Sequence, residues 1–221
     1  MVFAKKIFYD PRIELCIVIA GLYTGTLLYY TRELTLQVLS FAILTTATVY
    51  WSYSIRHGVV MSLRDFKLTI PKLGANVLIA IGLAVFGWFY FSLYTYLTRG
   101  YWLHLGYGGN LAGVFAIIAV SSAEEIFFRG YLQNRLSLYC PLWCRVLLAV
   151  AAMALYKDVV HFWRGMPIVL YIELFLVGVL HNVLPSLWME WSGSLAGPLV
   201  LHVVWDLLVY APLTAIPSWV I

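Results

Sequence analysis

The sequence predicts an all-α fold, a polytopic transmembrane bundle of about seven spanning helices, from three observations. Hydrophobic residues make up 63% of the 221 residues and charged residues only 11%, against about 45–50% and about 25% in a typical soluble domain. Nine Trp and sixteen Tyr are residue types that favour the membrane–water interface. A chain of this size could not bury so much apolar surface in water, so the bilayer must be part of its solvent.

Seven apolar stretches are long enough, or nearly so, to cross a bilayer as helices of about 20 residues. They are Glu14–Tyr30, Leu34–Tyr53, Ala75–Leu97, Leu111–Leu136, Val146–His161, Ile168–Met189 and Leu195–Leu213. The fourth is long and the fifth is short, which leaves room for one further break or a re-entrant piece. The sequence shows no internal repeat, so residues 1–221 are expected to form a single integral membrane domain.

Two polar segments separate these stretches. Ser54–Lys72 is the most polar part of the chain and is expected to lie in the headgroup region as a short amphipathic helix, ended by Pro71. The loop Arg99–Asn110 contains four glycines and is expected to be flexible.

The charges of the loops predict an orientation. A cytoplasmic N-terminus places Lys5, Lys6, Arg12 and most other loop Lys and Arg on the cytoplasmic side, as the positive-inside rule requires. We therefore expect a multi-pass protein of a bacterial or archaeal plasma (inner) membrane, with the lipid bilayer as a partner. The net charge of +4 is spread along the chain, so nucleic acid is not an expected partner.

Ionisable residues are concentrated within the later apolar stretches. Such groups cost roughly 2.5–3.5 kcal/mol each on membrane-insertion scales, so they mark functional sites by default. The set comprises Glu124, Glu125, Arg129, His161, Glu173, His181, His202 and Asp206. The motif-bearing core is therefore predicted at about residues 111–213.

Helical spacing divides this set into pairs. Glu125 and Arg129 are four residues apart and can form an ion pair on one helix face. Glu124 is rotated by about 100° from Glu125 on an α-helix, so its carboxylate can point elsewhere. His202 and Asp206 are also four apart, and a neighbouring carboxylate fixes the tautomer of an imidazole. The alternative for both pairs is that they only hold helices together.

Together these residue types suggest hydrolysis. A carboxylate and an imidazole can share a water and remove its proton as the water attacks a carbonyl. A second histidine can donate a hydrogen bond to the oxyanion that develops. This division of labour requires three helices to converge.

The motifs resemble a known family. The run EEIFFRG, Glu124–Gly130, is similar to the Glu-Glu-x-x-x-Arg motif of the CAAX protease and bacteriocin-processing (CPBP) family of intramembrane endopeptidases. The stretch Ser192–Asp206 resembles the last motif of that family, in which Asn or Asp follows a His by four residues. The basic, partly polar segment Ser62–Lys72 before the third apolar stretch also resembles the family.

The resemblance implies a role for each residue of the site. Glu124 would activate the water, helped by His161 as the histidine of the second motif. Glu125 and Arg129 would hold the geometry of the site. The oxyanion-stabilising corner would be His202 with Asp206.

Two positions depart from the family pattern. Lys157 occupies the place of the Phe that usually precedes the second-motif histidine by four residues, although Tyr156 is next to it. Asp206 replaces the more frequent Asn, and an ionised Asp cannot donate a hydrogen bond, so it would have to be protonated or act by orienting His202. An older interpretation of the family as zinc enzymes keeps a metal as an alternative; otherwise no cofactor is expected.

The substrate class stays open among the activities of the family. Its members remove C-terminal tripeptides from prenylated proteins, process bacteriocins and other peptides, or, in the myxosortase-like branch, trim C-terminal sorting signals. The expected partner is therefore a protein or peptide with a C-terminal processing signal. His181 and Glu173 match no motif and are interpreted as packing or substrate-groove residues. A small proton-coupled transporter and an inactive, protease-like scaffold are the alternatives.

Overall fold

A computed structural model describes residues 42–43, 45–50, 54, 67, 73–100, 102, 111–163 and 168–210. The elements in this part of the chain are α5 (Leu73–Arg99), α6 (Leu111–Glu124), the π-helix η1 (Glu125–Gln133), α7 (Asn134–Leu136), α8 (Leu142–Trp163), α9 (Ile168–Ser192) and α10 (Ala196–Tyr210). They are all helical, with no strand among the described residues, so the all-α prediction is confirmed.

The predicted apolar stretches coincide with the observed helices to within a few residues. Ala75–Leu97 lies inside α5, and the long stretch Leu111–Leu136 runs without a gap through α6, η1 and α7. The further break or re-entrant piece for which the sequence left room is absent from this stretch, where only the helix type changes. The first predicted stretch lies outside the described residues, and only parts of the second stretch and of the polar segment before α5 are described.

Local sequence explains how two of these helices end. Gly100 follows α5 with φ +77°, and its N–H donates to the carbonyl of Tyr96 at 2.9 Å. Gly193 follows α9 with φ +64°, and its N–H donates to Met189 O at 3.0 Å. A left-handed glycine after the last helical residue satisfies carbonyls that the helix leaves open. The side chain of Ser194 then accepts a hydrogen bond from Ala196 N–H, as a helix N-cap does.

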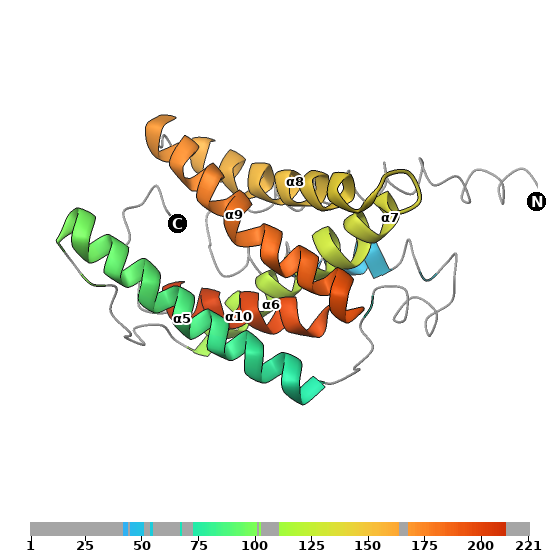
Figure 1. The fold of residues 1–221 in the computed structure, drawn as a ribbon, viewed down its shortest axis with the longest axis horizontal. Coiled ribbons are helices and arrows are strands. Elements are labelled where there is room, and N and C mark those ends of the chain that lie inside the picture. The colour runs from blue at the N-terminus through green and yellow to red at the C-terminus, as the bar shows by residue number, and fades with distance from the viewer. Residues whose placement is uncertain are drawn as a thin grey trace, which may run out of the picture.

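α10 occupies the centre of the described bundle. It packs lengthwise along α5 and also contacts α6, η1 and α9, while α8 packs against α9 and η1 (Figure 1). Two glycines allow the close approaches. A Cβ at Gly87 of α5 would lie 2.8 Å from the ring of Trp205, and one at Gly197 would lie 2.7 Å from the ring of Trp188.

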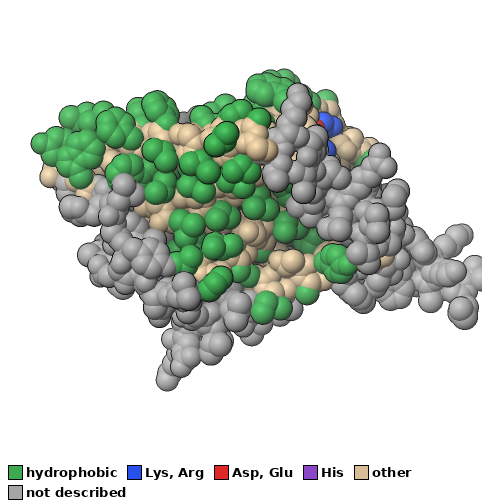
Figure 2. All heavy atoms as spheres, turned by 90° about the horizontal axis from the view of Figure 1, so that it is seen from below, with side chains coloured by type: hydrophobic (Ala, Val, Ile, Leu, Met, Phe, Trp, Pro, Cys, Tyr) green, Lys and Arg blue, Asp and Glu red, His purple; other side chains and the backbone are tan. Residues whose placement is uncertain are grey.

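The surface of the described part is apolar, as a lipid environment requires. One described helix, Gly74–Thr98, is long and apolar enough to cross a membrane, with a mean hydropathy of 2.0 and 17% of its apolar window buried. Shorter apolar segments are Leu142–Tyr156 within α8 and Ala196–Val209 within α10. Hydrophobic side chains spread over much of the face seen in Figure 2. Leu78, Phe86 and Tyr90 of α5 are among the most exposed.

Candidate active site

The Glu-Glu-x-x-x-Arg segment lies where two helix types join. Glu124 is the last residue of α6, and Glu125 begins η1, which runs for nine residues. Backbone bonds in a π-helix span five residues, so its turn is wider than that of an α-helix, and such segments are frequent at functional sites. Nearly the whole of η1 is buried, and its hydrophobic side chains pack with Met153 of α8.

Three carboxylates surround the imidazole of His202 in the interior. Nδ1 of His202 lies 2.6 Å from Oε1 of Glu125. Nε2 lies 3.2 Å from Oδ2 of Asp206 and 3.5 Å from Oε2 of Glu124. All four side chains are buried. The predicted pairing of His202 with Asp206 therefore forms, and α10 also brings His202 to both glutamates.

The contacts of His202 set how many protons the imidazole and its neighbouring carboxyl groups must share. A neutral imidazole has one N–H and one lone pair, whereas an imidazolium has two N–H groups. Because both ring nitrogens face carboxylate oxygens, hydrogen bonds at both require a second proton, either on His202 or on one of the carboxyl groups. The cluster can thus hold and exchange a proton at the position that faces Glu124.

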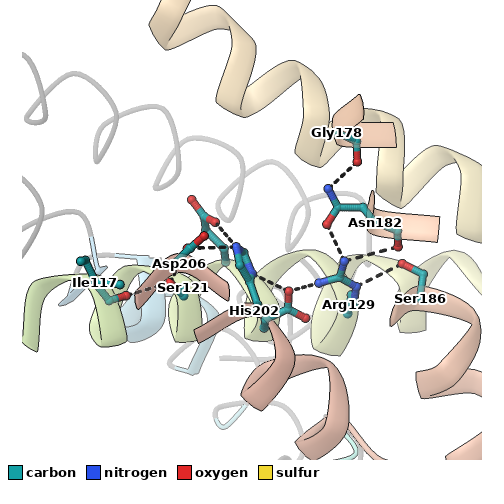
Figure 3. Close-up of polar contacts among 10 residues, drawn as sticks. Ile117, Ser121, Arg129, Gly178, Asn182, Ser186, His202 and Asp206 are labelled. Atoms are coloured by element: carbon teal, nitrogen blue, oxygen red, sulfur yellow. Dashed lines mark hydrogen bonds and ion pairs between the residues drawn. The ribbon is translucent and has the colours of Figure 1, made fainter. Parts of the chain in front are cut away.

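Asp206 is placed to accept hydrogen bonds. The hydroxyl of Ser121 on α6 lies 2.6 Å from Oδ2 of Asp206 and 2.8 Å from the carbonyl of Ile117 (Figure 3). The same Oδ2 atom faces Nε2 of His202. These contacts would let an ionised Asp206 orient His202, one of the two roles that the sequence leaves open for it, and the choice between the two stays a prediction.

Arg129 is held from two sides. Its Nη1 donates to Oε1 of Glu125, the ion pair that the four-residue spacing predicts. On the opposite side, Nε donates to the hydroxyl of Ser186 at 3.1 Å, and Nη2 donates to Oδ1 of Asn182 at 2.6 Å (Figure 3). The guanidinium is buried, and acceptors from both η1 and α9 fix its plane.

A second polar cluster lies at the far end of η1. The buried amide of Gln133 donates to Ser186 O at 3.2 Å and to Oε1 of Glu190 at 2.8 Å. Arg145 donates twice to Glu190, at 3.1 and 2.7 Å, and Lys67 donates to it at 3.4 Å. Glu190 lies just beyond the predicted membrane span. Its partial burial raises its pKa, but the hydrogen bonds from Gln133 and Arg145, with the positive charges of Lys67 and Arg145, hold the pKa of Glu190 below its usual value.

The remaining predicted residues are only partly described. The backbone at His161 belongs to α8, but its side chain and those of Lys157 and Glu173 lie outside the described residues. The ring of His181 lies 4.7 Å from that of Trp205, the neighbour of Asp206, which fits the packing interpretation. Among the described residues, no group of three or more His, Cys, Asp and Glu side chains is placed to hold a metal ion.

Asn182, Ser186 and Gln133 are polar residues of this region that the motifs do not single out. Asn182, Ser186 and Glu190 are spaced by four residues on α9, which puts them on one face of the helix. A polar stripe of this kind within an otherwise apolar segment is the sequence signal that could have identified Asn182 and Ser186.

The comparisons with known proteins agree with the motifs. Residues 108–208 match the family model described as type II CAAX prenyl endopeptidase Rce1-like. The matched segment contains α6, η1, α8, α9 and most of α10, and thus every residue of the site described above except Lys67. Neither the curated proteins nor the solved structures gave a match. Over residues 108–208 the chain therefore carries the pattern of the Rce1-like type II CAAX prenyl endopeptidases, and the CAAX protease resemblance of its motifs is confirmed.

Proposed function

We propose that the protein is a glutamate-dependent intramembrane endopeptidase that hydrolyses a peptide bond near the C-terminus of a membrane-associated protein or peptide. The observation that supports this most is the convergence of Glu124, Glu125 and Asp206 on His202, inside the segment that matches the family model. If the charged residues served only to hold helices together, one ion pair between each two helices would be enough. Three buried carboxylates around one imidazole are far more costly, and proton transfer explains why they are gathered.

In the proposed reaction, the carboxylate of Glu124 removes a proton from water as the water oxygen bonds to the scissile carbonyl carbon. The carbonyl oxygen becomes an oxyanion, to which the Nε2–H group of His202, shared with Asp206, donates a hydrogen bond, while the Nδ1 side of the ring stays on Glu125. Protonated Glu124 then gives its proton to the amide nitrogen, and the C–N bond breaks. The products are a new carboxyl terminus and a free amine.

The other site residues hold this geometry. Asp206 orients the ring of His202 through Nε2, and Glu125, paired with Arg129, holds the ring through Nδ1. His161, the histidine of the second motif, assists Glu124 with the water. The reaction as written needs neither a metal nor another cofactor.

The bundle would present this site within the bilayer. We infer about seven spanning helices, a cytoplasmic N-terminus and a location in a bacterial or archaeal plasma membrane. The hydrophobic surface in Figure 2 supports contact with lipid. The substrate would carry a C-terminal processing signal and reach the site while anchored in the same membrane.

The test compares the intact masses of membrane and surface proteins from cells that carry the wild type or Glu124→Gln. We expect a small set of proteins to keep extra C-terminal residues in the mutant alone. If no protein changes in mass while Glu124→Gln is expressed and folded, the protease assignment is wrong, and a transporter or an inactive scaffold becomes the better interpretation. Inhibition of wild-type cleavage by a zinc chelator would contradict the metal-free mechanism.

A further inference from the structure

Arg129 pairs with Glu125, and Glu125 contacts the imidazole of His202, so the groups that fix Arg129 also help to fix this imidazole. The Glu125 carboxylate oxygen that accepts from Arg129 is the one that faces Nδ1 of His202. A shift of the guanidinium would therefore move Oε1 of Glu125 and, with it, the ring that faces Glu124 and Asp206.

The side-chain amide of Asn182, a partner of Arg129 on α9, is held in one orientation by a hydrogen bond of its own. The Nδ2 group of Asn182 donates to the carbonyl of Gly178 at 2.7 Å, one turn earlier on the same helix. Because this bond uses the amide's donor, Oδ1 is turned toward Arg129 and accepts from Nη2. A flipped amide would place an N–H group against a guanidinium and lose both hydrogen bonds. Asn182 is 5% exposed, so water does not readily replace either bond.

Ser186 supplies the second contact, one turn further along α9. Its hydroxyl oxygen accepts from Nε of Arg129, and its backbone carbonyl accepts from Gln133. Arg129 and Gln133 are spaced by four residues on η1, as Asn182 and Ser186 are on α9. Figure 3 shows the guanidinium of Arg129 bonded to both Asn182 and Ser186. Such contacts resist both sliding and rotation of η1 along α9.

We propose that Asn182 and Ser186 are positioning residues for catalysis: they hold the Arg129 guanidinium in one orientation so that Glu125 keeps His202 aligned with Glu124. This inference rests on the proposed peptidase function. Neither residue contacts the imidazole or the carboxylate of Glu124 in the described contacts. They act through Arg129, so their loss should lower kcat and leave KM nearly unchanged.

The test measures kcat and KM for Ser186→Ala and Ser186→Thr in liposomes, with the substrate identified by the mass comparison and with rates expressed per folded molecule. Ser186→Ala removes the acceptor of Nε, and Ser186→Thr keeps a hydroxyl. We expect Ser186→Ala to lower kcat about 10-fold or more, because small misalignments of a catalytic group have effects of this size, with little change in KM. Ser186→Thr should recover most of the lost kcat.

Asn182→Leu and Asn182→Asp form a second pair with the same logic. Leu keeps the approximate shape of the side chain but removes both hydrogen bonds, whereas Asp keeps an oxygen facing Nη2 and loses the donor to Gly178 O, so Asn182→Asp should retain more kcat than Asn182→Leu. Leu184→Ala, at a side chain on α9 that is 71% exposed, is the matched control and should leave both constants unchanged.

The outcomes separate the two proposals. Unchanged kcat in Ser186→Ala and Asn182→Leu, or a loss in Ser186→Ala that Ser186→Thr does not recover, overturns the positioning role while the peptidase stands. A wild type that shows no Glu124-dependent cleavage refutes the peptidase, and the positioning role is refuted with it.

Discussion

At the scale of residues, spacing predicted those contacts that lie within one helix. Glu125 with Arg129, and His202 with Asp206, are four-residue pairs, and both form. The contact of His202 with Glu125 joins residues 77 positions apart, and only the packing of α10 against η1 sets it. Asn182 escaped prediction for the same reason, since its partner is on another helix. The side chain of His161 remains a prediction.

The lowered pKa of Glu190 makes a prediction about stability and pH. A carboxyl whose folded pKa is below its usual 4.5 stabilises the protein at pH 7, and this contribution is lost as pH falls through the folded pKa. Glu190→Gln should therefore lower the free energy of unfolding at pH 7 by roughly 1 kcal/mol, because the pairs are partly exposed.

Thermal melts of both proteins in detergent from pH 7 down to pH 3 would check this. The wild type and Glu190→Gln should converge at the acid end. A difference in melting temperature that stays constant over this range would show that the charge of Glu190 is not responsible. An Arg145→Gln variant, alone and combined with Glu190→Gln, would measure the coupling of that pair.

At the scale of elements, the lengths of the apolar stretches predicted where the described helices begin and end. They did not predict that the segment with the Glu-Glu-x-x-x-Arg motif continues as a π-helix. Residues 111–136 read as one long helix, and the structure confirms its extent. A π-helix differs from an α-helix in its hydrogen-bond register, which composition does not encode. Arg129, which lies within η1, contacts Asn182 and Ser186 of α9, so the segment whose helix type was not predicted is one that positions the site.

The contact of α9 with α10 predicts a strong effect at Gly197. A methyl group there would lie within 3 Å of three ring atoms of Trp188, so the ring or the helix must shift. We expect Gly197→Ala to destabilise the protein by about 1–3 kcal/mol, as overpacking does, despite the better helix propensity of Ala.

Gly82→Ala on α5 is the matched control, because no atom lies within 4 Å of the added methyl group. It should be neutral or slightly stabilising in the same thermal melts. Equal melting temperatures for Gly197→Ala and the wild type would mean that α9 and α10 do not approach as closely as described.

At the scale of the whole molecule, composition predicted a membrane protein, and the exposed apolar surface agrees with it. Seven spans remain a prediction, because Gly74–Thr98 is the one described helix that meets the length and hydropathy of a span. Leu142–Tyr156 and Ala196–Val209 are apolar but shorter than a span requires.

Seven spans with a cytoplasmic N-terminus place the C-terminus outside. An alkaline phosphatase fusion, active only outside the cytoplasm, should therefore be active at the C-terminus. A positive-inside orientation depends on Lys and Arg near the membrane, so the N-terminal charges set this outcome. Activity of a cytoplasmic reporter at the C-terminus would mean an even number of spans.

The measurement that tests the central claim most directly is the turnover of purified protein in liposomes on a peptide that contains the scissile bond. If Glu124 is the base, Glu124→Gln should lower kcat at least about 100-fold, with an unchanged melting temperature. If Glu124→Gln turns over at the wild-type rate, the carboxylate of Glu124 does not activate the water, and the mechanism proposed for this site is wrong.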